Sequence, residues 1–308
     1  MSNLLLIFVC LALGIAARRL GLMPPGGALP LNRFIVCVSL PALILSEVPP
    51  LLLRTQLTWS MLIPVSMAWI HFLLVWPFVG WVGQRWRWPR TTVGALILTA
   101  GLGNTSFVGL PLLEALLGGS AIGWGVIVDQ LGSFLVLSTL GIVVAMKFGA
   151  GPQQGPSTWR RILRFPPFVA ISTALLLSLS GLAPGEWSGP VLHRLAQTLV
   201  PLALFAVGLN LKLSLKTILE KREPLLLGIT LQLFLAPLFF LLLFHYVLGS
   251  DDLSTRVTIL EAGMATMINS AILASDCGLD EELANLMVGI SVPLSLLTVP
   301  LWAAMLPF

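Results

Sequence analysis

Residues 103–118, GNTSFVGLPLLEALLG, place polar and helix-breaking residues inside a long apolar stretch. Proline removes a backbone donor and crowds the carbonyl four residues earlier, and glycine allows the chain to bend. The sequence therefore predicts a helix broken at Gly109 and Pro111, whose freed carbonyls and helix ends can act as ligands. The side chains expected to bind a ligand beside this break are Asn104, Thr105 and Ser106.

A second stretch, residues 261–275, reads EAGMATMINSAILAS and is also polar within an apolar context. It contains no proline, so the position of its break is left open. The alternative for both stretches is close helix packing through small residues, with hydroxyl and amide groups bonding between helices. Because two such stretches occur, broken helices are favoured. The candidate binding residues of the second stretch are Thr266, Asn269 and Ser270.

An acidic residue inside an apolar segment, Asp129, is a candidate for ion coupling. A carboxylate at membrane depth is costly unless it meets a cavity, a proton or a partner. A hydrogen bond to a neighbouring helix is the alternative for Asp129. Glu47 and Glu114 are expected to face external water, and a lone histidine such as His71 is expected to pack within the protein.

Sequence motifs for known intramembrane or ATP-driven chemistry are missing. The chain has no HExxH, no GxSxG, no Walker motif and no paired intramembrane aspartates, so an enzyme is not expected. Cys10, Cys37 and Cys277 lie apart, without metal-binding spacing, and are expected to be apolar fillers. No cofactor is expected beyond a coupling ion, either a proton or sodium.

The composition is that of an integral membrane protein. Of 308 residues, 57% are hydrophobic and 10% charged, whereas soluble domains have about 25% charged residues. A helix needs ~20 residues to cross a bilayer, and apolar runs of this length recur. The candidate transmembrane helices are 3–18, 31–49, 59–82, 91–117, 122–146, 165–182, 191–210, 224–248, 256–275 and 283–305.

The basic residues predict the orientation. With the N- and C-termini outside, all of the 17 Lys and Arg residues except Arg54, Arg194 and Arg256 fall on the cytoplasmic side, as the positive-inside rule requires. We expect a multi-pass protein of the plasma membrane, which is the inner membrane in a bacterium. The charges form no contiguous basic face, so nucleic acid is not an expected partner.

The arrangement of segments predicts an internal repeat. Ten crossings divide into five and five, and an odd number of crossings inverts the second half. Residues 31–43, LNRFIVCVSLPAL, resemble 192–204, LHRLAQTLVPLAL. The expected halves are 1–150, with helices 1–5, and 151–308, with helices 6–10.

Five segments carry a resemblance to a known family: ARRLGLMP, LNRFIVCVSLPALIL, GNTSFVGLPL, PLALFAVGLNL and SLLTVPLW. They resemble the auxin efflux carrier family, which includes plant PIN-type carriers and bacterial dicarboxylate carriers. The resemblance runs from end to end and is more specific for the family than for a substrate.

The resemblance implies a fold related to bile acid sodium symporters. That fold is all-α, with ten transmembrane helices in a 5+5 inverted repeat and helices 4 and 9 broken and crossing. Helices 1, 2, 6 and 7 would form a scaffold, and helices 3–5 and 8–10 a transport domain. Asn104 and Pro111 match the motif of the fourth helix, and Asn269 matches a polar position near the ninth crossing. A glutamate in the ninth helix helps hold sodium in that fold, which makes sodium near Glu261 an expectation.

The expected function is secondary active transport of a small organic anion by alternating access at the crossing of helices 4 and 9. Malonate, malate, another mono- or dicarboxylate, or an auxin-like weak acid would suit such a site. A channel or a nontransporting membrane sensor on the same fold is the alternative, and an intramembrane enzyme is less favoured. The expected partners are the carboxylate substrate and the lipid bilayer, and a homodimer is compatible with the fold.

Overall fold

The computed structural model describes residues 2–24, 26–54, 62–149, 166–185, 188–210 and 215–307. These residues are predominantly helical and contain no β-strand beyond one isolated bridge. They form two compact units. Unit 1 comprises Met1–Trp59, Ser106–Gln130 and Pro156–Leu211, and unit 2 comprises Ser60–Thr105, Leu131–Gly155 and Lys212–Phe308.

Several helices are long and apolar enough to cross a membrane. Six meet this condition within the described residues: Ala28–Leu53, Leu62–Arg85, Gly119–Phe148, Ser188–Leu209, Arg222–Val247 and Glu281–Met305. Shorter apolar helices cover Thr105–Leu117 and Pro166–Leu179. The orientation expected from the basic residues rests partly on residues 160–164 and on Lys212, which lie outside the described residues.

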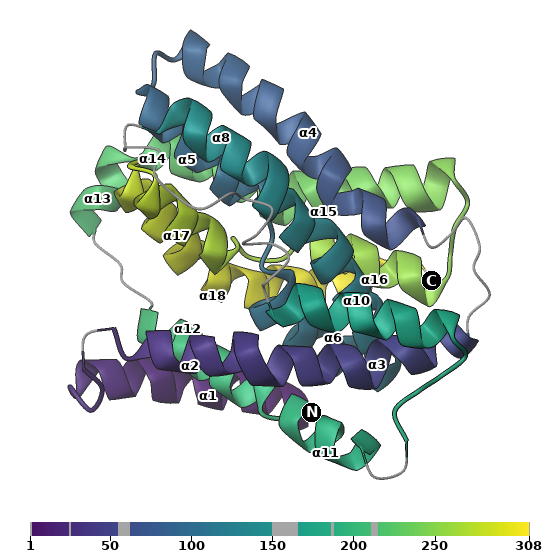
Figure 1. Cartoon of the computed structure of the whole chain (residues 1–308). Helices are drawn as coiled ribbons and strands as arrows, with labels where there is room; N and C mark the ends of the chain where they lie inside the picture. The colour runs from purple at the N-terminus through teal and green to yellow at the C-terminus, as the bar shows by residue number, and fades with distance from the viewer. Residues whose placement is uncertain are drawn as a thin grey trace. The chain divides into compact units, whose positions relative to one another are not determined.

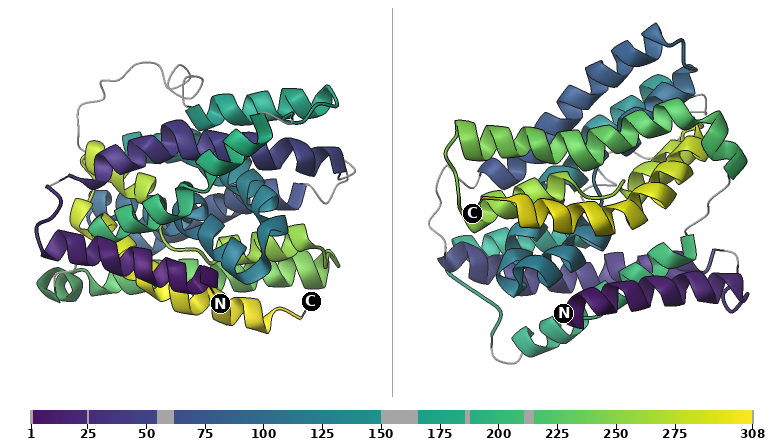
Figure 2. Two further views of the ribbon diagram at one scale, coloured as in Figure 1. Left: turned by 90° about the horizontal axis from the view of Figure 1, so that it is seen from below. Right: turned by 180° about the vertical axis from the view of Figure 1, so that it is seen from behind.

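Unit 1 is built on one long bent helix (Figure 1). Its N-terminal part α2 continues through a π-helical turn, η1, into α3, against which α10 and α11 pack, while α1 runs along α12 (Figure 2). The elements of this unit are α1 (Ser2–Arg19), α2 (Ala28–Phe34), η1 (Ile35–Ser39), α3 (Leu40–Arg54), α6 (Leu110–Leu117), η4 (Gly119–Ala121), α7 (Ile122–Ile127), α10 (Pro166–Leu179), α11 (Ser188–Ala196) and α12 (Leu199–Asn210).

Close packing of α1 on α12 depends on two glycines. A Cβ built on Gly14 would lie 3.0 Å from the Cα of Gly208, and a Cβ on Gly208 would lie 3.0 Å from the Cα of Gly14. Helices in lipid gain little from apolar burial and associate through such close backbone contact. A larger residue at either position would push the two helices apart.

Unit 2 contains the longest uninterrupted helices, α4 and α18. Helices α4, α8, α14 and α18 all pack against α5, which is buried almost throughout. Its elements are α4 (Leu62–Arg85), α5 (Arg90–Gly101), η6 (Leu137–Gly141), α8 (Ile142–Phe148), α13 (Leu215–Glu220), α14 (Arg222–Thr230), η7 (Leu231–Leu235), α15 (Ala236–Phe240), η8 (Leu241–Val247), α16 (Leu253–Ala262), α17 (Ile268–Asp276) and α18 (Glu281–Met305).

An acidic residue just before α18 connects three segments of this unit through hydrogen bonds. Asp280 caps the helix by accepting a hydrogen bond from the backbone N–H of Leu283 at 3.1 Å, and it also accepts from Thr92 at 2.7 Å and from Lys221 at 2.6 Å. Burial raises the pKa of Asp280, but these hydrogen bonds and the lysine charge lower it by more, so the pKa lies below its ordinary value of 3.8.

Candidate functional site

The first helix break lies at residues 102–104, between α5 and the π-helical turn η3 (Thr105–Gly109). Leu102 is extended, with φ −132° and ψ 114°, and Gly101 and Gly103 flank it. Glycine is a poor helix former because fixing its backbone costs more entropy than fixing that of other residues. The two glycines therefore favour an end to α5 at this point.

The prediction that Gly109 and Pro111 break the helix is wrong. Both residues lie in helical backbone, in the path from η3 into α6. Local π-helical widening and neighbouring helices can accommodate proline in a membrane helix, and η3 supplies such widening just before Pro111. Proline thus marks a turn of altered geometry, and the break itself falls several residues earlier.

The second break lies between Ala262, where α16 ends, and Ile268, where α17 begins. Gly263 caps α16, and a Cβ at this position would lie 3.2 Å from the Pro237 ring, so glycine allows α15 to approach. Met267 is extended, with φ −64° and ψ 125°. A break therefore forms here without a proline in the broken segment.

The two breaks pair with each other through their backbones. Gly103 and Thr266 form an antiparallel bridge. The N–H of Asn104 donates to the carbonyl of Ala265 at 2.6 Å, and the N–H of Met267 donates to the carbonyl of Leu102 at 2.9 Å. Backbone groups released from a helix need partners when water is excluded, and each break supplies partners for the other.

Thr266 is the centre of a buried polar network around this pairing. Its hydroxyl lies 2.8 Å from the Gln232 side-chain carbonyl and 3.0 Å from the Thr99 backbone carbonyl. Its N–H donates to Ser291 at 2.9 Å. The Gln232 amide in turn donates to the Leu102 carbonyl at 3.1 Å. Side chains from α18 and η7, together with a backbone carbonyl of α5, thereby hold the paired breaks in one geometry.

Four other predicted binding residues lie in or beside the two breaks of unit 2. Asn104 and Thr105 are 1% and 0% exposed. Asn269 is half-buried in the first turn of α17, and Ser270 is buried, with its hydroxyl donating to the Met267 carbonyl at 2.7 Å. The structure thus collects polar groups from sequence-distant segments around one pair of breaks.

The remaining predicted residues divide between the units. Ser106, Gly109 and Pro111 belong to unit 1 and are buried. Asp129 also belongs to unit 1, is 2% exposed and accepts a hydrogen bond from the Gln130 amide at 2.6 Å. Glu261 is fully buried in the last turn of α16, in unit 2.

The described part of the chain contains no cluster of side chains that could hold a metal ion. No group of three or more His, Cys, Asp and Glu side chains there has the proximity needed to hold a metal ion. Sodium near Glu261 stays a prediction, because sodium is also bound by carbonyl and hydroxyl oxygens.

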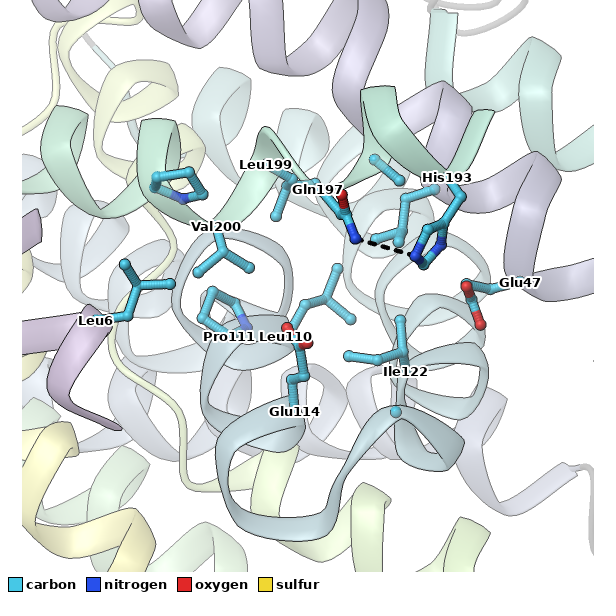
Figure 3. Close-up of a pocket in the computed structure, with 14 residues that line it drawn as sticks. Leu6, Glu47, Leu110, Pro111, Glu114, Ile122, His193, Gln197, Leu199 and Val200 are labelled. Carbon is cyan, nitrogen blue, oxygen red and sulfur yellow. Dashed lines mark hydrogen bonds between the residues drawn. The ribbon is translucent and has the colours of Figure 1, made fainter. Parts of the chain in front are cut away.

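Unit 1 contains a pocket of about 490 Å³ beside α6 (Figure 3). Its walls are largely apolar and come from α1, α3, α6, α11 and α12. Pro111 and Leu110 of the predicted motif line it. The motif therefore reaches a cavity at its proline end.

Two carboxylates and an imidazole are among the side chains that line this pocket (Figure 3). Glu47 comes from α3, Glu114 from α6 and His193 from α11. His193 and Glu114 both lie close enough to Glu47 to interact with it electrostatically. Gln197 lies 3.1 Å from the His193 Nε2 atom. The pocket is therefore an apolar cavity whose walls carry two carboxyl groups and an imidazole.

A protein-family model described as membrane transport protein, which represents the auxin efflux carrier family, matches residues 1–303. The chain belongs to this family. The match confirms the resemblance seen in the sequence. With several membrane-length helices, this family member is a multi-pass membrane transporter.

Two archaeal relatives are similar over almost their whole length. An uncharacterized transporter of Methanothermobacter thermautotrophicus is 29% identical over 99% of this chain and 98% of its own. An uncharacterized transporter of Methanocaldococcus jannaschii is 23% identical over 98% of this chain and 97% of its own. The similarity therefore covers both breaks and the pocket.

Sequence reasoning missed several residues of this family member's site. Gln232 carries a signal that could have found it, because it is an amide within the apolar span Arg222–Val247. The sequence leads us to expect Glu47 and Glu114 to face external water, and it does not indicate that they share a pocket. Their place on one pocket, together with His193, had no signal in spacing because the three residues come from distant segments.

Proposed function

We propose that this membrane transporter is a secondary active carrier of a small carboxylate, which binds at the two broken helices. One observation carries the proposal: the breaks at 102–104 and 263–267 are paired through their backbones inside a buried polar network. In transporters, discontinuous helices at membrane depth present their positive N-terminal ends to anionic groups of a substrate. Malonate, malate and auxin-like weak acids are the substrate classes that fit this chemistry.

The proposed binding residues surround these breaks and follow them along the chain. Polar side chains and helix N-terminal N–H groups suit a carboxylate, because both can donate hydrogen bonds. Gly109 and Pro111 would shape the helix that follows the first break. The full proposed set is Asn104, Thr105, Ser106, Gly109, Pro111, Thr266, Asn269 and Ser270.

We also propose ten membrane crossings in a 5+5 inverted repeat, with helices 4 and 9 crossing and both termini outside a plasma membrane. Support comes from helical segments near each expected position and from the paired breaks in the fourth and ninth. Unit 1 holds helices 1, 2, 6 and 7, which supports their role as a scaffold. Ser106–Gln130, assigned to the transport domain by resemblance, groups with unit 1, so the moving part would be centred on unit 2.

Coupling to an ion gradient is proposed through Asp129 or Glu261. Each is a buried carboxylate in an apolar helical segment, and such groups mark ion and proton pathways in membrane proteins. A proton would bind the carboxylate directly, and sodium would need further oxygen ligands.

A channel or nontransporting sensor on the same fold is the competing function. A channel would pass ions at rates above carrier turnover, and a sensor would bind ligand without flux. The buried, hydrogen-bonded breaks favour a carrier, because an enclosed site has to be exposed in turn to each side of the membrane.

The test is uptake of radiolabelled malonate into proteoliposomes with an inward proton or an inward sodium gradient. Uptake that follows one gradient and falls to background in Asn104→Ala supports the carrier and names the ion. Asn285→Ala, which removes an exposed asparagine on α18, is the control and should transport normally. Flux without gradient dependence and at channel rates would contradict a coupled carrier.

A further inference from the structure

A groove between α4 and α8 in unit 2 has features of a lipid-binding site. It has a volume of about 420 Å³ and is lined by Trp76, Gly80, Trp81, Gln84, Lys147 and Phe148. Both helices end here with basic residues, Arg85 on α4 and Lys147 on α8. Basic and aromatic residues at helix ends are typical of the membrane interface.

Two cations face the same aromatic ring at this groove. The Nζ atom of Lys147 lies 5.7 Å from the centre of the Phe148 ring and 5.5 Å from that of Trp76. The Arg90 guanidinium lies 5.9 Å from the Phe148 ring centre and donates a hydrogen bond to the Lys147 carbonyl. No carboxylate in the described ranges forms an ion pair with either cation. The pair therefore presents uncompensated positive charge.

Both helices also carry exposed apolar side chains at or one turn from the groove lining. On α4, Trp81 lines the groove and is 64% exposed, and Leu73, one turn before the lining residue Pro77, is 53% exposed. On α8, Val143, one turn before Lys147, is 44% exposed. Such side chains on membrane-length helices suit contact with acyl chains. A bound molecule that satisfied both regions would need an anionic head and an apolar tail.

We propose that this groove binds an anionic phospholipid, with its phosphate between Lys147 and Arg90 and an acyl chain along α4 and α8. Basic pockets between transmembrane helices recognise anionic headgroups in this way. A free phosphate would use the cations but leave the adjoining apolar surface without a ligand. Trp81 and Gln84 would flank the glycerol region, where amphipathic and polar side chains meet the headgroup level.

The experiment is native mass spectrometry of the full chain released from nanodiscs that contain phosphatidylcholine and phosphatidylglycerol. The wild type should retain phosphatidylglycerol in preference to phosphatidylcholine. Lys147→Gln combined with Arg90→Gln should reduce bound phosphatidylglycerol at least tenfold. Arg222→Gln combined with Arg87→Gln removes two exposed basic residues outside the groove lining and should leave it unchanged.

Gly80→Leu tests the groove without altering its charge. A Cβ at Gly80 has no atom within 4 Å, so a larger side chain at this lining position would project into the groove, and leucine favours the helix more than glycine does. Bound phosphatidylglycerol should be lost while the melting temperature is kept. Retention of phosphatidylglycerol at the wild-type level in both this variant and the double glutamine variant would overturn the proposal. Displacement of the lipid by millimolar inorganic phosphate would also overturn it, in favour of a simple anion site.

Discussion

The paired breaks of unit 2 and the pocket of unit 1 use polar residues in opposite ways. At the breaks, buried polar groups bond to one another and to backbone, as Thr266 does with Gln232 and Ser291. In the pocket, Glu47 and Glu114 stand on apolar walls beside a cavity. The first arrangement satisfies its polar groups within the protein, and the second leaves two carboxylates beside a cavity. If the proposed carrier function holds, we expect the breaks to favour a bound carboxylate and the pocket carboxylates to oppose one.

The largest expected effect is on ligand binding at the breaks. Asn104→Ala and Asn269→Ala should each weaken malonate binding by at least tenfold, because a hydrogen bond to a charged carboxylate is worth about 1.5–3 kcal/mol. Isothermal titration calorimetry on purified protein would measure it, with monodispersity on gel filtration as the folding control. Unchanged affinity in both variants would remove the breaks from the binding site.

Substitution of the two buried carboxylates should show which of them couples transport to the ion gradient. If Asp129 carries the coupling ion, Asp129→Asn should reduce gradient-driven malonate uptake severalfold and leave counterflow exchange, while Glu261→Gln should retain the gradient response. The reverse outcome would assign coupling to Glu261 in unit 2. Gradient dependence that survives in both variants would return both carboxylates to structural roles. Proteoliposome uptake with and without an ionophore measures the difference.

The network behind the breaks should be sensitive to the loss of one amide. Gln232→Leu removes the acceptor for Thr266 and a donor to Leu102, so we expect a loss of about 1–2 kcal/mol in stability and lower uptake. Gln197→Leu, on the exposed side of the unit 1 pocket, should leave the melting temperature unchanged. An equal loss of stability in the two variants would show that Gln232 in the buried network contributes no more than Gln197 beside the pocket. Thermal unfolding in detergent is the measurement.

Neutralising Glu47 and Glu114 in the unit 1 pocket should moderately lower the KM for malonate, whereas the substitutions at the breaks weaken malonate binding. Glu47→Gln with Glu114→Gln removes repulsion of an incoming anion, so the KM for malonate should fall about threefold at low salt and less at high salt. Glu281→Gln with Glu282→Gln, both exposed and outside the pocket, is the control. A rise in KM would indicate that these carboxylates assist the substrate.

The smallest effect on transport is expected at Asp280. Because its pKa is lowered in the folded protein, its interactions stabilise the fold fully above about pH 5 and are lost as pH falls through the lowered value. Asp280→Asn should lower stability by about 1–3 kcal/mol at pH 7 with little change in malonate KM. Asp252→Asn is the control: asparagine can still accept the hydrogen bond from the Thr255 N–H, so neither the stability nor the malonate KM should change. Melting temperatures between pH 3 and pH 7 would show the loss in the wild type and a flatter profile in Asp280→Asn.

The sequence predicted the helical class, the family and the two polar stretches, because each leaves a local signal in hydropathy or motif. The predicted position of the first break is wrong because Pro111 does not end a helix. A π-helical turn just before this proline accommodates it. The partner of Leu102 could not be found locally, since Met267 and Gln232 reach it from distant segments. The acidic pocket was missed for the same reason: only the fold brings Glu47, Glu114 and His193 to one cavity.

The backbone bonds between the breaks leave room for evolution. Gly103 and Thr266 are joined through main-chain atoms, and the flanking bonds of Asn104 and Met267 are also donated by main-chain N–H groups. Any residue other than proline can supply those donors. The side chains of Asn104 and Met267 can therefore change among relatives with different substrates while these backbone bonds persist. We expect substrate choice to diverge faster than the architecture that presents it.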